Sequence, residues 1–233
     1  MHLFYCPTFN GDLIELPEEE AHHAASVLRL RVGERIGLLN GKGLRAEAEL
    51  VEVNKRRCMA QVIERAQHAA ERTARIHMAV AMTKQMERYE WFVEKAVEIG
   101  VDRITPLITS RTERNTIRLD RLERVAVAAM KQSQRTWLPV IDPLMRMDAL
   151  IALDLPTQRC FGWCEDDHAQ FTSAYAPSAD AMVLIGPEGD FTAEEAELLR
   201  SNGFAAVSLG HARLRTETAA IAACTWMSLA QQR

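Results

Sequence analysis

Two loops of the sequence place carboxylate and guanidinium groups directly after apolar runs. In the first, Gly186-Pro187-Glu188-Gly189 follows residues 182–185, and two glycines around Pro-Glu predict a tight, exposed loop at the carboxyl end of a strand. Open α/β sheets bind ligands at this edge. A plain strand-to-helix turn is the alternative, but such a turn would not need both glycines and an exposed carboxylate. The loop is therefore a candidate ligand site.

The second loop, residues 208–218, also follows a predicted strand and carries Arg213, Arg215 and Glu217 before a helix that is apolar nearly all round. A fixed guanidinium can stabilise negative charge that develops on a reacting group. A neighbouring carboxylate can orient that guanidinium or accept a proton. The alternative is a structural Arg–Glu pair with a threonine cap.

Several common catalytic signatures are missing from the chain. It contains no G-x-x-x-x-G-K-S/T phosphate loop and no G-x-G-x-x-G after a strand. It also contains no G-x-S-x-G elbow and no H-E-x-x-H motif. Kinase, Rossmann dehydrogenase, serine hydrolase and zinc protease activities are therefore excluded, and the glycine-rich loop of Rossmann-type methyltransferases is missing as well.

The cysteines and histidines do not form a metal-binding pattern. Five cysteines are scattered along the chain, and the close pair Cys160 and Cys164 has no second pair to complete a zinc site. His22 and His23 on the first predicted helix are expected to pack or to bond the backbone rather than to bind a metal. We expect no metal, and cysteines that act as small buried hydrophobic residues.

Charge is distributed unevenly along the chain. The net charge of −4 argues against bulk affinity for nucleic acid. Residues 84–135 nevertheless hold 11 Lys/Arg against 8 Asp/Glu, whereas residues 136–233 hold 6 against 13. A basic middle beside an acidic half can seat an anionic partner on one face. Helix surfaces that merely happen to be basic are the alternative.

The first 70 or so residues read as short strands. Residues 44–50 alternate apolar with polar side chains, and they follow the run 35–39 across an Asn-Gly turn, which predicts a hairpin. A third strand is expected at 58–63, and Pro17 opens a predicted helix. This part predicts a small antiparallel β-barrel that carries one helix. Polar residues 67–73 form the expected linker.

After the linker, predicted strands alternate with predicted helices, which indicates a mostly parallel α/β sheet. A helix is expected at 86–99, with Trp91 in the core and Gly100 as its C-terminal glycine. A strand at 101–104 is expected to end before Pro106. The remaining strands are expected at 76–81, 159–163, 182–185 and 206–209, and the remaining helices at 120–132, 192–201 and from 217 to the end.

No apolar run approaches the roughly 20 residues that a membrane-spanning helix needs. The first seven residues lack the basic-then-apolar order of a signal peptide. We therefore expect a cytoplasmic protein.

The order of these motifs resembles the C-terminal half of the SPOUT methyltransferases and, more narrowly, the RsmE family. The resemblance rests first on the strand–Gly-Pro-Glu-Gly–helix–strand order and on Leu-Gly-x-x-x-Leu-Arg-Thr-Glu-Thr-Ala at 209–219. Further segments are similar to the family in the same order: 23–29 (H-x-x-x-V-L-R), Lys84 with 95–101, 104–107 with Arg111, and 132–135 (Q-S-Q-R). The chain departs from the family pattern at His2 (usually arginine), Lys131 (glutamate), Asp190 (glycine) and Arg213 (isoleucine).

The resemblance implies a fold and an activity. The expected fold is a PUA-like β-barrel RNA-binding domain at 1–72, followed at 73–233 by an α/β SPOUT domain with a mostly parallel, trefoil-knotted sheet. The expected enzyme transfers a methyl group from S-adenosylmethionine to N3 of a uridine in 16S ribosomal RNA, the family's position 1498, in the small ribosomal subunit. A cytoplasmic homodimer with shared active sites is implied as well. The alternatives are a SPOUT enzyme that methylates a tRNA ribose 2′-oxygen and a non-catalytic RNA-binding relative.

The same resemblance implies roles for individual residues. Arg215 and Glu217 are the expected catalytic pair. The expected cofactor-binding residues are Leu184, Ile185, Gly186, Pro187, Glu188, Gly189, Leu209, Gly210, Leu214, Arg215, Thr216, Thr218 and Glu165. The expected RNA-binding residues are Arg29, Lys84, Arg88, Arg111, Arg114 and Arg135.

Overall fold

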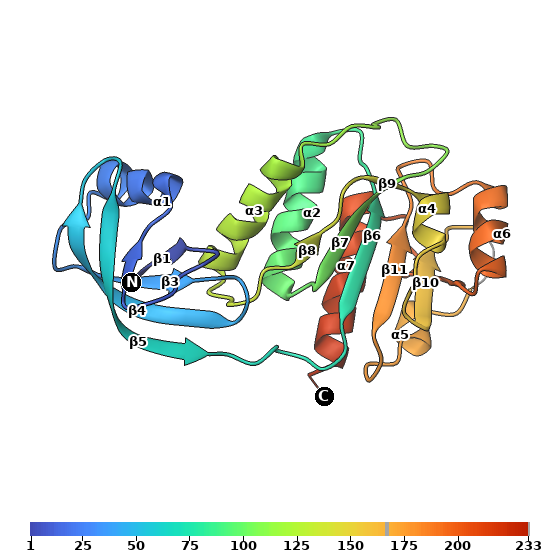
Figure 1. Cartoon of the computed structure of the whole chain (residues 1–233). Helices are drawn as coiled ribbons and strands as arrows, with labels where there is room; N and C mark the ends of the chain where they lie inside the picture. Colours follow the sequence, from blue (N-terminus) through green and yellow to red (C-terminus); the bar gives the residue numbers. More distant parts are fainter. Residues whose placement is uncertain (166–167, 233) are drawn as a thin grey trace. The chain divides into compact units, whose positions relative to one another are not determined.

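The computed structural model of the chain describes residues 1–165 and 168–232. These residues form two compact units that are not consecutive stretches of sequence. The N-terminal unit comprises Met1–Glu71 together with Val127–Leu138, and the C-terminal unit comprises Arg72–Ala126 together with Pro139–Arg233. The division therefore falls inside the helix α3 (Leu119–Gln132), which contributes to both units (Figure 1).

The N-terminal unit is built on a five-stranded sheet in the order β1-β3-β4-β5-β2. Its strands are β1 (His2–Tyr5), β2 (Leu13–Glu15), β3 (Arg35–Leu39), β4 (Leu44–Val53) and β5 (Cys58–Gln67). The predicted hairpin and third strand are present, but β1 pairs with β3 in parallel. A parallel pair needs a long crossover. The chain between the two strands provides it through β2, the helix α1 (Glu18–His22) and the π-helical turn η1 (His23–Val27).

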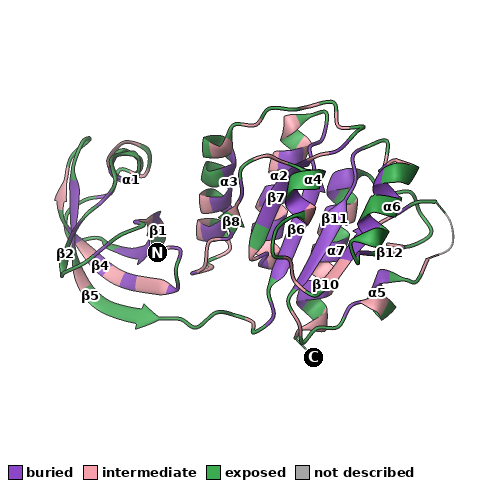
Figure 2. Ribbon diagram, turned by 45° about the vertical axis from the view of Figure 1, so that its right-hand side comes forward, coloured by how far each residue is buried: buried purple, intermediate pink, exposed green. Residues whose placement is uncertain are grey.

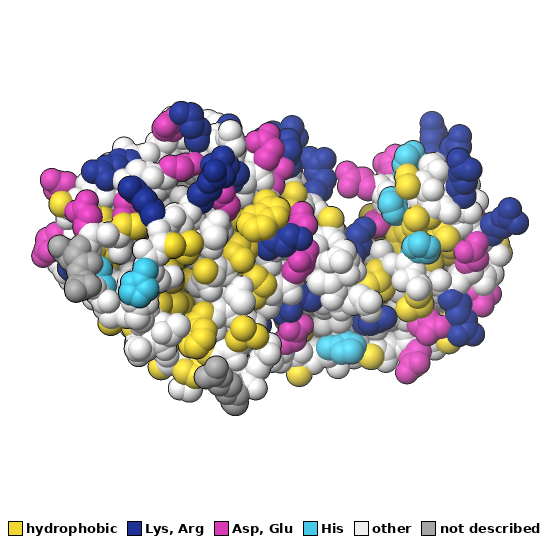
Figure 3. All heavy atoms as spheres, turned by 180° about the vertical axis from the view of Figure 1, so that it is seen from behind, with side chains coloured by type: hydrophobic (Ala, Val, Ile, Leu, Met, Phe, Trp, Pro, Cys, Tyr) yellow, Lys and Arg dark blue, Asp and Glu magenta, His cyan; other side chains and the backbone are white. Residues whose placement is uncertain are grey.

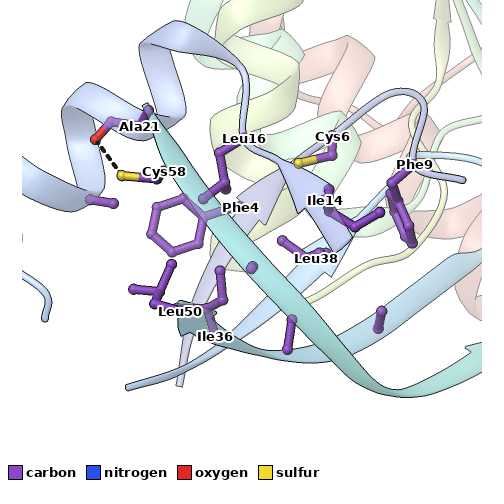
Figure 4. Packing of buried hydrophobic residues seen from close by; sticks show 14 of the residues in the cluster. Phe4, Cys6, Phe9, Ile14, Leu16, Ala21, Ile36, Leu38, Leu50 and Cys58 are labelled. Carbon is purple, nitrogen blue, oxygen red and sulfur yellow. Dashed lines mark hydrogen bonds between the residues drawn. The ribbon is translucent and has the colours of Figure 1, made fainter. Parts of the chain in front are cut away.

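The core of this unit is a single cluster of apolar side chains between the sheet and α1. Figure 4 shows Phe4, Leu16, Ile36 and Leu50 directed toward one another, and these side chains are at most 3% exposed. The Cys58 thiol lies 3.6 Å from the carbonyl oxygen of Ala21, which joins β5 to α1. This packing holds the helix on the sheet.

Lys131, one of the departures from the family pattern, has a clear partner within the N-terminal unit. Its ammonium lies 2.6 Å from Glu20 Oε1, and the same oxygen accepts a hydrogen bond from the Tyr5 backbone N–H at 3.1 Å. Glu20 is only 8% exposed. A buried carboxylate needs such partners because an unpaired charge would be costly. Lys131 therefore compensates the charge that Glu20 buries.

The C-terminal unit is built on a parallel seven-stranded sheet. Six strands follow the order β12-β10-β11-β6-β7-β8, and β9 also pairs with β7. The strands are β6 (Ile76–Ala81), β7 (Arg103–Ile108), β8 (Val140–Ile141), β9 (Met145–Arg146), β10 (Gln158–Gly162), β11 (Ala181–Ile185) and β12 (Ala205–Val207). The other helices are α2 (Met86–Ile99), α4 (Met147–Ile151), α5 (Phe171–Ala174), α6 (Ala193–Ser201) and α7 (Thr216–Ala230). The predicted parallel α/β sheet is confirmed.

Helices cover both faces of this sheet, and its strands are buried along most of their length (Figure 2). Helices α2 and α7 pack on each other, and α7 also packs on β6 and β11. On the other face, Leu150 of α4 and Leu199 of α6 join a cluster with Phe161 and Leu184 of the sheet. The segment after the edge strand β12 therefore leads back across the sheet to α7, which packs on the central strands β11 and β6.

Pro106 does not end its strand, contrary to the prediction from sequence. It lies inside β7, opposite Val80 of β6. On its other side, β8 pairs with Arg103 and Ile104, and β9 pairs with Leu107 and Ile108. Proline lacks a backbone donor and is tolerated where a sheet needs none. Pro106 lies between the residues that pair with β8 and those that pair with β9, so no neighbouring strand needs its backbone donor on that side. The strands β8 and β9 have two residues each, too few to leave a periodic pattern in the sequence.

Candidate functional site

Three loops with predicted ligand-binding residues meet at the carboxyl edge of the C-terminal sheet. They follow β10, β11 and β12, which are neighbours in the sheet although the sequence separates them. Leu184 and Ile185 end β11 and are buried, whereas Glu188 and Glu165 are exposed in the loops after β11 and β10. The parallel topology therefore brings together segments that the sequence could only place one by one.

The loop 186–191 is attached to the first turn of α7. The Thr216 hydroxyl donates a buried hydrogen bond to the carbonyl oxygen of Gly186 at 3.0 Å. A Cβ atom on Gly186 would lie 3.1 Å from Asp190 Oδ1 and 3.2 Å from the Phe191 ring. A side chain at this position would press on Asp190 and Phe191, because the loop folds closely on itself.

Asp190 connects two of the three loops. It adopts a left-handed backbone conformation with φ 62°, which Asp tolerates better than most residues. Its Oδ2 accepts from the Cys164 backbone N–H at 3.0 Å, and its Oδ1 accepts from the Phe191 N–H at 2.8 Å. Burial, and then the charge of Asp190, raise the pKa of the Cys164 thiol, so that this thiol stays protonated near neutral pH. A carboxylate at the family's glycine position thus links the loops after β10 and β11.

Arg111 holds the outer side of the loop 186–191. Its Nη1 donates to the carbonyl oxygens of Gly189 at 2.5 Å and of Phe191 at 3.0 Å. A Cβ atom on Gly189 would lie 3.2 Å from the Arg111 side chain. Gly189 therefore makes room for this arginine. In the structure the Arg111 guanidinium thus contacts backbone carbonyls of the protein, whereas the sequence analysis expected it to contact an RNA phosphate.

Two carboxylates complete the support of this loop. Glu188 Oε1 accepts from the Lys84 backbone N–H at 3.0 Å, which connects the loop to the segment after β6. Glu195, 8% exposed, accepts from the Ser110 N–H at 2.7 Å and from the Thr192 N–H at 2.9 Å. The capping box at the start of α6 is therefore also a link to the loop after β7. This second link joins residues 85 positions apart, so no local sequence pattern could indicate it.

Arg215 and Glu217 line one pocket but are not paired with each other among the described contacts. Glu217 Oε1 lies 3.8 Å from Arg88 Nε of α2, and the Glu217 side chain is 9% exposed. Arg215 is exposed at the N-cap of α7. The expectation that Glu217 orients Arg215 therefore needs correction, because the helix geometry turns the carboxylate toward α2. The partner of Glu217 is Arg88, which the sequence analysis assigned to RNA binding.

The other predicted RNA-binding residues differ in how strongly the protein itself engages them. The Lys84 ammonium lies 2.9 Å from Glu113, and Arg135 forms an ion pair with Glu71. Lys84 and Arg114 line a small pocket of about 280 Å³ together with Glu113, Asn115 and Thr116. Arg29 is exposed, with φ 56°, directly after η1. Lys84 and Arg29 are exposed, whereas Arg114 is half-buried and its Nη2 donates to the Lys84 carbonyl oxygen at 3.4 Å.

Trp91 is not in the core, contrary to the prediction from sequence. It is 45% exposed, whereas Phe92 and Val93 beside it are fully buried. Helix α2 turns the stripe formed by Tyr89, Phe92, Val93, Ala96 and Val97 inward. Trp91 lies outside this stripe, and only the packed helix shows which apolar residues face inward.

The third loop, which follows β12, leaves open space beside Gly210. Gly210 has φ 118°, and nothing lies within 4 Å of the position of a Cβ atom on it. Leu209 and Leu214 are partly buried on either side of it, and Thr218 is exposed on the first turns of α7.

Across residues 1–165 and 168–232, we find no cluster of three or more His, Cys, Asp or Glu side chains that could hold a metal ion. In the same residues, no helix is long and apolar enough to cross a membrane.

Comparison with known proteins identifies two domain families in the chain. Residues 70–228 match the family described as RNA methyltransferase domain. Residues 16–63 match the RNA methyltransferase PUA domain. The first of these matches alone covers more than half of the chain.

Individual relatives match over nearly their whole length. The ribosomal RNA small subunit methyltransferase E of Rickettsia conorii is 28% identical, over 93% of this chain and 89% of that protein. The crystal structure of a probable rRNA methyltransferase from Porphyromonas gingivalis is 38% identical, covers 100% of this chain and 99% of its own, and superimposes with a TM-score of 0.92. The crystal structure of a ribosomal RNA small subunit methyltransferase E from Neisseria gonorrhoeae bound to S-adenosyl methionine is 28% identical. It covers 98% of this chain and 97% of its own, and superimposes with a TM-score of 0.88.

Proposed function

Since the chain belongs to the RsmE family of S-adenosylmethionine-dependent methyltransferases that act on small-subunit ribosomal RNA, we propose that it methylates N3 of a uridine in 16S ribosomal RNA, at the family's position 1498. The observation that carries the proposal is the pocket beside the three loops. There the buried carboxylate of Glu217 lies among the arginines of α2 and of the loop 208–215.

The three loops fit S-adenosylmethionine. The open side of Gly210 and the partly buried Leu209 and Leu214 suit an adenosyl group held by backbone and apolar contacts. When bound, this cofactor supplies an electrophilic methyl group on its sulfonium, so the protein must provide position and electrostatics. The backbone hydrogen bonds that hold the loop 186–191 in place serve that purpose.

The chemistry at uridine N3 requires removal of a proton. Neutral uridine is a poor nucleophile at N3, and negative charge spreads to O2 and O4 as the proton leaves. Arg215, at the N-cap of α7, would stabilise this charge, and Oε2 of Glu217, which has no hydrogen-bond partner among the described residues, would accept the proton. Both groups belong to the first turn of the helix that Thr216 attaches to Gly186.

Phosphates of the RNA need cations around this pocket. The exposed Arg29 and Lys84 and the half-buried Arg114 suit this role, and of these Lys84 pairs with the exposed carboxylate of Glu113. Arg135 and Arg88 are held by carboxylates in partly buried positions. Phosphate contacts position the RNA without reading its sequence. The PUA domain would add shape-selective contact.

Helix α7 carries an apolar surface that suits a second copy of the chain. On α7, Ala222 and Leu229 are exposed, and Thr225 and Trp226 are partly buried. Figure 3 shows hydrophobic side chains gathered on this face of the C-terminal unit. We infer a cytoplasmic homodimer joined on this face, with an active site shared between subunits. Sedimentation of a fully active monomer near 26.2 kDa would contradict this.

Arg111→Ala is expected to weaken S-adenosylmethionine binding roughly tenfold or more, because the loop 186–191 loses two charge-assisted hydrogen bonds. Calorimetry on the purified variant measures this. Arg118→Ala is the matched control, since Arg118 is exposed on the same segment and pairs with Asp120. If Arg111→Ala keeps its cofactor affinity and only loses salt-dependent RNA binding, the arginine contacts RNA phosphate instead.

Asp190→Gly is expected to weaken cofactor binding by roughly tenfold, because glycine keeps the left-handed backbone but deletes the hydrogen bond to Cys164 that joins the two loops and the bond to Phe191 within the loop 186–191. The control is Asp154→Gly, which changes an exposed aspartate elsewhere on the C-terminal unit. Equal affinity of both variants and the unmodified protein would show that the loops hold their geometry without Asp190.

The proposed function is tested by methylation with labelled cofactor. The substrates are purified small ribosomal subunits that lack the modification, naked 16S ribosomal RNA and tRNA. We expect transfer to the ribosomal substrates, with the label at N3 of one uridine by nucleoside analysis. Label on a tRNA ribose would identify a SPOUT enzyme of different target, and no transfer to any substrate would identify a non-catalytic RNA-binding relative.

A further inference from the structure

A pocket of about 650 Å³ opens between the first turns of α2 and α7. The residues that line it come from these two helices and from the loop that precedes α7: Glu87, Arg88, Trp91, Arg213, Leu214, Arg215, Glu217 and Thr218. The hydrogen bond from Thr216 to Gly186 places it beside the cofactor loops. The pocket is thus an aromatic and charged space adjacent to the proposed cofactor loops.

Trp91 contributes an aromatic surface to this pocket. Its side chain is 45% exposed, although its neighbours Phe92 and Val93 are fully buried. A large aromatic face left in water favours binding of another flat group, because stacking on a nucleobase removes both faces from water. Every base has such a face, so stacking alone provides affinity without selecting a base.

Glu217 contributes a hydrogen-bond acceptor that the described part of the protein leaves unused. Its side chain is 9% exposed, and Arg88 Nε lies 3.8 Å from its Oε1. Its Oε2 is buried and has no hydrogen-bond partner among the described residues. An unsatisfied buried acceptor is costly, so the site favours a ligand that donates a hydrogen bond there.

The polar groups of the pocket match the edge of one base in particular. Uracil presents an acceptor, a donor and an acceptor along O2, N3–H and O4. Glu217 accepts, and the guanidinium groups of Arg88 and Arg215 donate and line the same pocket. Cytosine carries a lone pair at N3, which a carboxylate repels. The pocket therefore complements the imide edge of uracil.

We propose that this pocket binds the target uracil, with Trp91 stacked on its face and the Glu217 carboxylate opposite N3–H. The proposal rests on the proposed function and adds a substrate-binding residue, Trp91, which the sequence analysis assigned to the core. A base in this pocket has left its own stack in the RNA, and Trp91 replaces part of the stacking that the base has lost. The other occupant to be considered is a second copy of the chain, and the experiment distinguishes the two.

The experiment compares Trp91→Phe with Trp91→Leu in the full-length protein. Both variants keep an apolar side chain, but only phenylalanine keeps an aromatic face. With unmodified small ribosomal subunits as substrate, we expect Trp91→Leu to raise KM for the subunits or lower kcat/KM roughly tenfold to hundredfold, the usual effect of losing one base–aromatic stack. Trp91→Phe should retain most of the activity. Calorimetry should give both variants the cofactor affinity of the unmodified protein.

Three results would overturn the proposal. If Trp91→Leu and Trp91→Phe are equally active, the aromatic face has no role. If the loss in Trp91→Leu is accompanied by dissociation in sedimentation, Trp91 contacts a second copy of the chain. If cofactor affinity falls in proportion, the residue supports the cofactor loops. Failure of the proposed function itself looks different, because then the unmodified protein places no label at uridine N3.

Discussion

Replacing Arg215 with alanine is expected to lower the turnover number by roughly a hundredfold or more, which is the usual cost of losing one preorganised charge stabiliser. S-adenosylmethionine affinity should stay nearly intact, because backbone and apolar groups dominate the proposed cofactor contacts. The side chain is exposed at the N-cap of α7, so its removal should not disturb the packing. Single-turnover methylation of small subunits, together with calorimetry of cofactor binding, measures both quantities.

The matched comparison for this variant is Arg213→Ala. It removes the same charge two residues earlier in the same loop, and Arg213 lines the same pocket. If the two variants lose turnover equally, the number of positive charges matters rather than their position. If Arg215→Ala weakens RNA binding but turns over normally at saturation, the residue contacts phosphate and its catalytic role has to be dropped.

The second large effect is expected for Glu217→Gln. The amide is similar in size to the carboxylate but cannot accept a proton from uridine N3. Proton transfer by a positioned side chain typically contributes roughly 10²–10⁴-fold to a rate, and we expect a loss in that range. Rapid-quench measurement of the methyl-transfer step on small subunits determines it.

The control for this variant is Glu94→Gln on α2, whose carboxylate pairs with Lys95 at 2.7 Å. It should behave as the unmodified protein does. Thermal unfolding is needed beside the kinetics, because Glu217 is buried against Arg88 and its neutralisation leaves that guanidinium without a carboxylate. A normal transfer rate in a folded Glu217→Gln variant would remove the carboxylate from the mechanism.

Several features could be predicted because their causes are local. The alternation of apolar and polar residues at 44–50 and the Asn-Gly turn before it predict the β3–β4 hairpin. The structure shows how the asparagine of this turn stabilises it. Asn40 Oδ1 accepts from the backbone N–H groups of Lys42 and Leu44. Gly100 ends α2 with φ 99°, where its position after the helical run placed it. In each case the interaction involves residues close in sequence.

Features that depend on pairing between distant segments could not be predicted. The strand order β12-β10-β11-β6 places loops from residues 163 to 215 along one edge, although no local pattern encodes that order. Segment 127–138 belongs to the N-terminal unit, where Gly43 donates to the Thr136 carbonyl oxygen and Leu138 to that of Gly41. Such contacts join residues about 95 positions apart and leave no periodic signal.

The same distinction applies to the candidate site. By itself the sequence determined the chemistry of the two loops, since glycines around Pro-Glu and the run Leu-Arg-Thr-Glu-Thr set what their backbone and side chains can do. Only the tertiary structure decided how these groups are used. It turned Glu217 toward Arg88, aimed Arg111 at the carbonyls of the loop 186–191, and left Trp91 outside the core. The physical reason is that the direction of a side chain depends on which face of its helix or loop packs, and that face is chosen by elements far away in the sequence.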